Sequence, residues 1–151
     1  MSTFAKNPSI MIADFQLEYY WDMYKNYKVK SYIPTGAIEE ISIIDLYRKW
    51  ARHMAFNDED KTPHAIEQNA LKYFKEYFED GMLKLSGPGG ELSYLCYAAM
   101  RIQTYYYYRY YDESNPFSSN VPYFEILSEN GSIKRRIPKE RWNFWVKAMG
   151  Y

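Results

Sequence analysis

Several features that commonly mark a protein's compartment or chemistry are scarce or missing in this chain. It has one cysteine, Cys96, so an internal disulfide is excluded and nothing indicates an oxidising compartment. No apolar run approaches the roughly 18 residues of a membrane span, and the N-terminal residues lack the apolar core of a signal peptide. We therefore expect a cytoplasmic protein, or a viral one in the virion or the host cytoplasm.

The formal net charge is zero as well, because 19 basic residues balance 19 acidic ones. A neutral chain gains little from bulk attraction to nucleic acid or to an anionic membrane, so such binding would need a local patch. Copies of a neutral chain also repel one another weakly, which favours a homo-oligomer or a protein partner. We expect no membrane association.

Aromatic residues, in contrast, are abundant. The chain contains 18 Tyr, 8 Phe and 4 Trp, and its hydrophobic fraction is 47%. This composition excludes a disordered tail as the main description of the chain, and a chain of this length can bury roughly 70% of its unfolded surface. The mean hydropathy of -0.59 reflects the tyrosines, whose rings still offer apolar area. We expect a single compact domain.

The segment from Glu91 to Tyr111 has the most apolar helical pattern. Its apolar residues recur at three- and four-residue steps, and only Arg101 and Arg109 carry charge after Glu91. A helix with so few charges should be covered on most sides, by its own domain or by a partner. Because tyrosine and threonine also favour pleated surfaces, a strand over 104–111 is the alternative.

Capping signatures place the other helices. Asn7-Pro8 and Thr62-Pro63 each combine an N-cap with proline at the first helical position, and Ser42 with Asp45 resembles a capping box. Gly81 predicts the end of the third helix, and the brief alternation over 82–85 allows a short strand there. The expected helices span about residues 8–27, 42–56, 63–80, 91–111 and 139–149, and an extended piece covers 29–33.

The last third of the chain changes character and predicts a β-hairpin over 123–137. Asn130-Gly131 can supply the positive φ angles of a type I′ turn, which would place Glu129 opposite Ser132 and Glu125 opposite Arg136. The fold class is therefore helix-dominated α+β, with four to five helices and a C-terminal β-hairpin. The hairpin face expected to pack on the helices carries Phe124, Ile126, Ile133 and Ile137.

The strongest functional feature is the charge of this hairpin and of the residues after it. Residues 132–151 contain six basic residues and one acid, whereas residues 112–131 contain four acids and no base. A basic hairpin beside helices is how winged-helix proteins place cations against phosphates. The alternatives are cross-strand pairing on a solvated surface and an acidic protein partner. The nucleic-acid candidates are Lys134, Arg135, Arg136, Lys139 and Arg141.

The tyrosine run, which comprises Tyr105 to Tyr108 with Tyr110 and Tyr111, is a candidate protein interface. Tyrosine is enriched at interfaces because its ring is apolar while its hydroxyl can hydrogen-bond. Stacking on bases would need a cationic groove, and Arg101 and Arg109 alone make a thin one. A self-packed helix with its hydroxyls in water is the other interpretation. The interface candidates are Tyr105, Tyr107, Tyr108, Tyr111 and Arg109.

Catalytic chemistry has the least support in the sequence. His53 and His64, with the acids at 58–60 between them, could hold zinc or iron, but the spacing matches no known metal loop. Those acids also suit the start of a helix, where its dipole favours negative charge.

We therefore predict a non-enzymatic protein interaction or assembly module without a cofactor or a metal. Size and tyrosine content suit a small viral or phage structural or accessory protein. Nucleic-acid binding through the hairpin is the alternative hypothesis, and a small metal-dependent enzyme is the third. The carboxylate row Asp14, Glu18 and Asp22 is interpreted as the solvated face of a helix.

Overall fold

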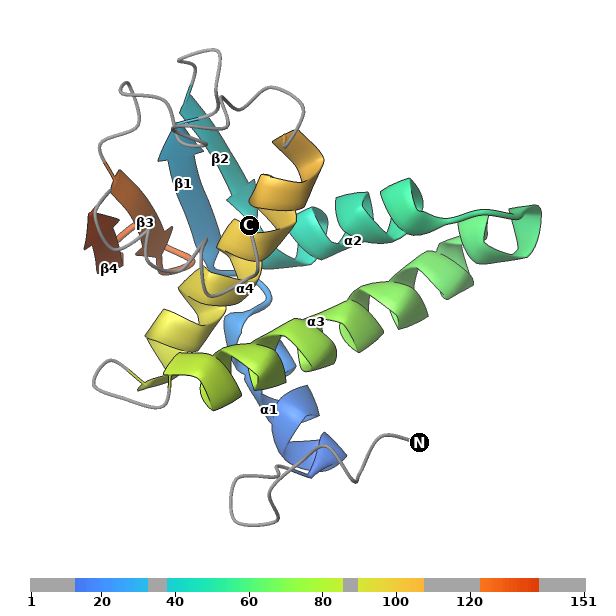
Figure 1. Cartoon of the computed structure of the whole chain (residues 1–151), viewed down its shortest axis with the longest axis horizontal. Helices are drawn as coiled ribbons and strands as arrows, with labels where there is room; N and C mark the ends of the chain where they lie inside the picture. Colours follow the sequence, from blue (N-terminus) through green and yellow to red (C-terminus); the bar gives the residue numbers. More distant parts are fainter. Residues whose placement is uncertain (1–12, 33–37, 86–89, 108–122, 139–151) are drawn as a thin grey trace.

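Helix α4 (Gly90–Tyr107) lies between a four-stranded sheet and the other helices (Figure 1). The computed structural model describes residues 13–32, 38–85, 90–107 and 123–138. The predicted fold class is confirmed: the described residues form four α-helices and a C-terminal antiparallel strand pair. The expected helix over 139–149 lies outside them. The other elements are α1 (Asp14–Tyr24), β1 (Lys28–Tyr32), β2 (Ile38–Ser42), α2 (Ile43–Met54), the 3-10 helix η2 (Asp58–Lys61), α3 (Pro63–Leu85), β3 (Tyr123–Leu127) and β4 (Ile133–Pro138).

The hydrophobic core surrounds α4. Residues 95–100 are six consecutive residues with no exposed surface, so this stretch of helix is covered on every side. Helix α3 packs against α4, and β3 and β4 contact it as well. The scarcity of charge in α4 is thus explained by its own domain over this stretch. The strand alternative is wrong for 104–107, because α4 continues to Tyr107.

The sheet is antiparallel throughout, with strand order β2-β1-β3-β4. The expected extended piece is β1, the strand that pairs with both β2 and β3. Strand β2 was not predicted, because its sequence IEEIS does not alternate; pairing with β1 holds it extended. The face toward α4 carries Val29, Ile126 and Ile137, all buried in the main core.

Two of the capping predictions are confirmed at the start of α2 and of α3. The Ser42 hydroxyl accepts a hydrogen bond from the Asp45 backbone N–H at 3.2 Å, and Thr62 Oγ1 accepts one from Ala65 N at 3.2 Å. The Asp45 carboxylate does not complete the capping box; it accepts from Arg48 Nη1 at 3.2 Å. The helix predicted over about 8–27 is shorter than expected, because Ala13 is an extended N-cap and α1 spans Asp14–Tyr24. The Asn7-Pro8 signature itself lies outside the described residues.

The predicted end of α3 at Gly81 is wrong, and so is the short strand after it. The helix continues to Leu85. Gly81 is buried where α3 and α4 cross, and a Cβ there would lie 3.1 Å from Tyr97 Cδ1 and 3.3 Å from Tyr94 Cα. The glycine therefore serves close helix packing and does not adopt a left-handed cap.

The hairpin exists, but its turn differs from the predicted type I′ turn. Of the described residues at the tip only Gly131 has positive φ, at 92°, whereas a type I′ turn needs two such residues. Ser128 N donates to Ser132 O at 2.8 Å, so the loop has three residues and Ser128, not Glu129, faces Ser132. The predicted pair of Glu125 with Arg136 is confirmed.

A register shift follows from this longer loop. It falls between Ile126 and Leu127 and sets Leu127 opposite Ile133. Ile126 and Ile137 are buried as expected, but Ile133 is 54% exposed, so its predicted packing on the helices is wrong. The side chain of Phe124 lies outside the described residues.

Candidate interaction surfaces

Helix α1 is apolar on two opposite faces. Its inner face buries Leu17, Trp21 and Tyr24 in the core. Its outer face carries Phe15, Tyr19 and Met23, spaced four residues apart and 72%, 61% and 39% exposed. We call these three residues the α1 stripe. Four-residue spacing places them in one row along the helix, so they form one continuous apolar strip.

The inner face of α1 is held firmly by aromatic packing. The Trp21 ring lies 5.0 Å from the Phe74 ring and 6.0 Å from the Tyr47 ring, measured between centroids. Tyr20 stacks on Phe78 at 5.1 Å. These contacts join α1 to α2 and α3, so the α1 stripe is presented by a rigid element.

The acids of α1 form ion pairs with lysines. Lys75 Nζ of α3 lies 3.0 Å from Glu18 Oε1, and Lys25 Nζ lies 3.5 Å from Asp22 Oδ1. Asp14 stands in the first turn, where the helix dipole favours a carboxylate. All three acids are exposed, as expected for the solvated face of a helix.

The tyrosine run cannot be placed as an interface from the described side chains. Tyr105 and Tyr107 belong to α4, but only their backbone is described. Tyr108, Arg109 and Tyr111 lie outside the described residues. Their role as interface candidates stays a prediction. Among the described residues, α1 carries the exposed aromatic side chains Phe15 and Tyr19, and Phe56 after α2 is exposed as well. Sequence reasoning did not identify the row on α1.

The cations of β4 point in different directions. Arg136 donates to Glu125 Oε2 from Nε at 2.9 Å and from Nη2 at 2.7 Å. Arg135 is opposite Ile126, on the face toward α4, and its buried Nε has no hydrogen-bond partner. The predicted candidates Lys139 and Arg141 lie outside the described residues.

Burial raises the pKa of the Cys96 thiol on α4, and the nearby charge of Arg135 opposes this only in part.

On the sheet face turned away from α4, one residue from each strand forms a row of alternating charge. The registers place Glu40 opposite Lys30, Lys30 opposite Glu125, and Glu125 opposite Arg136. Each charge thus has an opposite charge on the neighbouring strand, an arrangement that stabilises a sheet. The basic hairpin is partly neutralised within its own sheet.

A polar network links α2, α3 and α4 beside the core. Asp80 Oδ2 accepts hydrogen bonds from Tyr97 at 2.9 Å and from Arg101 Nη1 at 2.6 Å. The Arg101 guanidinium lies 4.6 Å from the centre of the Tyr77 ring, over its face. Tyr77 in turn accepts a hydrogen bond from Trp50 Nε1 at 3.1 Å. With Asp80 about three-quarters buried, this network fixes helix packing.

The two histidines occupy separate elements. His53 stacks on Trp50 in the last turn of α2, with ring centroids 5.3 Å apart, and His64 stands exposed in the first turn of α3. Across the ranges that the structure describes, no three His, Cys, Asp or Glu side chains are grouped as a metal ion would need. Among the same residues, no helix combines the length and the apolarity that crossing a bilayer requires.

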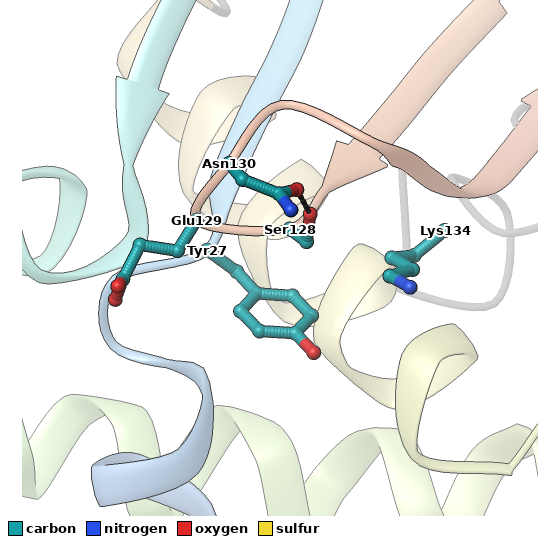
Figure 2. A pocket seen from close by; sticks show the side chains of 5 residues that line it. All are labelled: Tyr27, Ser128, Glu129, Asn130 and Lys134. Atoms are coloured by element: carbon teal, nitrogen blue, oxygen red, sulfur yellow. Dashed lines mark hydrogen bonds between the residues drawn. The ribbon is translucent and has the colours of Figure 1, made fainter.

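An open groove of about 540 Å³ lies at the hairpin tip (Figure 2). Tyr27, which follows α1, lines it from one side, and residues of the loop between β3 and β4 line it from another. Sequence reasoning did not find this groove, because it joins segments about 100 residues apart. Its lining residues are Tyr27, Ser128, Glu129, Asn130 and Lys134.

Comparison with known proteins adds no function to this geometry. No protein-family model matches the chain, and no curated protein or solved structure is significantly similar to it.

Proposed function

We propose that this chain is a non-enzymatic interaction module that self-associates through the α1 stripe. The observation that carries the proposal is the exposure of Phe15, Tyr19 and Met23 in one row on a rigid helix. Removing apolar surface from water contributes about 25 cal/mol of favourable free energy per Å² buried. Aromatic residues and methionine are also enriched in the cores of protein interfaces. The helix already buries its other face, so folding of the domain does not require the stripe.

A second copy of the chain is the partner that suits this surface. Two α1 helices packed antiparallel about an axis near Tyr19 would set Phe15 of one copy against Met23 of the other. The zero net charge removes long-range repulsion between copies.

Sedimentation velocity over a concentration series tests the proposal. The wild-type chain should shift from monomer to dimer as its concentration rises. The double variant Phe15→Ser with Tyr19→Ser should stay monomeric, because it removes most of the apolar stripe without touching the buried face of α1. The matched control is Phe56→Ser, which removes an equally apolar side chain that is 90% exposed and lies between α2 and η2.

Two outcomes would contradict self-association through α1. One is a wild-type chain that remains monomeric across the series. The other is a Phe56→Ser variant that dissociates as fully as the stripe variant, which would indicate unspecific apolar contact.

Nucleic-acid binding through the hairpin is a second candidate with narrower support. Lys134 is an exposed cation with no ion pair to another described residue, and the basic positions 139 and 141 follow it in the sequence. Arg135 lies on the face toward α4, and Arg136 binds Glu125 although its side chain is 54% exposed, so Lys134 is the cation of β4 that no described residue pairs. A gel shift at low salt that Lys134→Ala weakens would support this function, and no shift would reject it.

A further inference from the structure

The groove at the hairpin tip brings together hydrogen-bond donors from three separate segments. The Tyr27 hydroxyl comes from the connection between α1 and β1, the Asn130 amide from the hairpin loop, and the Lys134 ammonium from β4. Figure 2 shows the Tyr27 hydroxyl and the Lys134 ammonium on the same side of the groove.

The orientation of Asn130 is fixed by its own loop. Its Oδ1 accepts hydrogen bonds from Ser132 N at 3.2 Å, from Ser132 Oγ at 3.0 Å and from Ser128 Oγ. The oxygen is therefore fully used within the loop, and the amide Nδ2 hydrogens remain to donate outward. Gly131, with φ of 92°, closes the loop that holds this arrangement. The donor is thus organised before any ligand arrives, which lowers the cost of binding.

The charge in the groove is favourable to an anion. Lys134 makes no ion pair or hydrogen bond to another described residue, so its charge is not neutralised within the described part of the chain. Glu129 is the one acid in the lining, and its carboxylate points away from Lys134 and from the Tyr27 hydroxyl (Figure 2). The side of the groove that Tyr27 and Lys134 share therefore offers donors and one positive charge.

We propose that this groove binds an oxyanion, a carboxylate or a phosphate group, on the Lys134 ammonium, the Asn130 amide and the Tyr27 hydroxyl. Both groups present several acceptor oxygens, and a charged acceptor makes each hydrogen bond stronger. The site is independent of the α1 stripe, so its failure would leave the self-association proposal intact.

Titration of the isotope-labelled chain, followed by NMR, tests the site. Inorganic phosphate and acetate are added in separate arms, with sodium chloride holding the ionic strength constant. The Asn130 side-chain amide signals should move saturably in at least one arm and remain still in chloride alone. Saturation by phosphate alone assigns a phosphate ligand, and saturation by acetate assigns a carboxylate; either result supports the site.

Variants separate this site from general attraction of anions to the surface. Lys134→Met should weaken binding about tenfold or more, the loss expected for a hydrogen bond to a charged group. Tyr27→Phe keeps the ring that packs on Tyr24 and should weaken binding less. Lys72→Met, which removes an exposed lysine on α3, should bind as the wild type does. Absence of saturation in both arms, or equal binding by Lys134→Met, overturns the proposal.

Discussion

The Tyr24 hydroxyl of α1 donates a hydrogen bond to the Glu91 carboxylate in the first turn of α4. Burial is the main cause that raises the pKa of Tyr24, and the hydrogen bond and charge of Glu91 raise it further. The carboxylate also stands where the helix dipole favours negative charge. This contact ties α1 to the helix at the centre of the core, so the α1 stripe is displayed on a fixed support.

The free energy of unfolding should fall at alkaline pH, because Tyr24 holds its proton more tightly in the folded chain than in the unfolded chain. An unfolded tyrosine loses its proton near the ordinary pKa of 10.0, whereas folded Tyr24 keeps its proton to higher pH. Below pH 10.0 the contribution of Tyr24 to stability is fully present. Above this pH the unfolded chain binds fewer protons than the folded chain, so the free energy of unfolding falls until the folded pKa is passed. Urea unfolding measured at about pH 9 and about pH 11 should show a smaller decline for Tyr24→Phe than for the wild type.

The control for this prediction is Tyr19→Phe, which removes an exposed hydroxyl from the opposite face of the same helix. Its decline between the two pH values should match that of the wild type. An equal decline in wild type and Tyr24→Phe would show that Tyr24 carries none of the effect.

Tyr47 and Tyr97 should respond in opposite ways to loss of the hydroxyl. Both side chains are fully buried, but the Tyr47 hydroxyl has no hydrogen-bond partner, whereas the Tyr97 hydroxyl donates to Asp80. Tyr47→Phe removes an unsatisfied polar group and should raise the free energy of unfolding by about 1 kcal/mol. Tyr97→Phe leaves the partly buried Asp80 carboxylate short of one donor and should lower the free energy of unfolding by about 1 kcal/mol.

Urea denaturation of the two variants beside the wild type measures both changes. Each variant is the other's control, since both remove one oxygen from a buried ring. If Tyr47→Phe is destabilised as much as Tyr97→Phe, the Tyr47 hydroxyl must contribute a favourable interaction, contrary to its buried, unsatisfied position.

Much of the fold follows from local signals in the sequence. The Ser42 and Thr62 caps act on N–H groups three residues away, so they could be recognised without knowing the rest of the chain. Strand β2 and the role of Gly81 depend on other segments: β1 holds β2 extended, and Tyr94 and Tyr97 exclude a side chain at Gly81. Such contacts leave little trace in a short stretch of sequence.

The candidate surfaces were harder to find for the same reason. The four-residue spacing of Phe15, Tyr19 and Met23 was a usable signal. The more apolar stripe through Trp21 correctly indicated the buried face, and a second apolar face on the same helix was not considered. The direction of Arg135 depends on the register of β4 against β3, which basic charge alone cannot specify. The groove needs both Tyr27 and the hairpin loop in place.

Loss of Arg136 should destabilise the sheet, because it leaves a buried carboxylate without its partner. The Glu125 side chain is 2% exposed and receives two hydrogen bonds from Arg136, whose own side chain is 54% exposed. Arg136→Ala should lower the free energy of unfolding by about 2 kcal/mol, within the range for hydrogen bonds to charged groups. Urea denaturation measures the change, with Lys134→Ala as the control on the same strand.

Glu125→Gln distinguishes this explanation from loss of Arg136 packing. If the unpaired charge causes the damage, Arg136→Ala should cost less in the Glu125→Gln background than in the wild type. Equal cost in both backgrounds would assign the effect to the alkyl part of Arg136.

Gly81→Ala should destabilise the protein even though alanine is the better helix former. Within an exposed helix the change would gain about 1 kcal/mol, but here the new methyl group would lie 3.1 Å from Tyr97 Cδ1 and 3.3 Å from two Tyr94 backbone atoms. Tyr97 is fully buried and bound to Asp80, and the Tyr94 atoms are backbone, so neither neighbour can move away easily. Overpacking of this kind costs about 1–3 kcal/mol, so we expect a net loss of about 1 kcal/mol in urea denaturation. Lys72→Ala, on the exposed side of the same helix, should be close to neutral. A Gly81→Ala variant as stable as the wild type would mean that α3 and α4 can separate at this crossing without loss of packing.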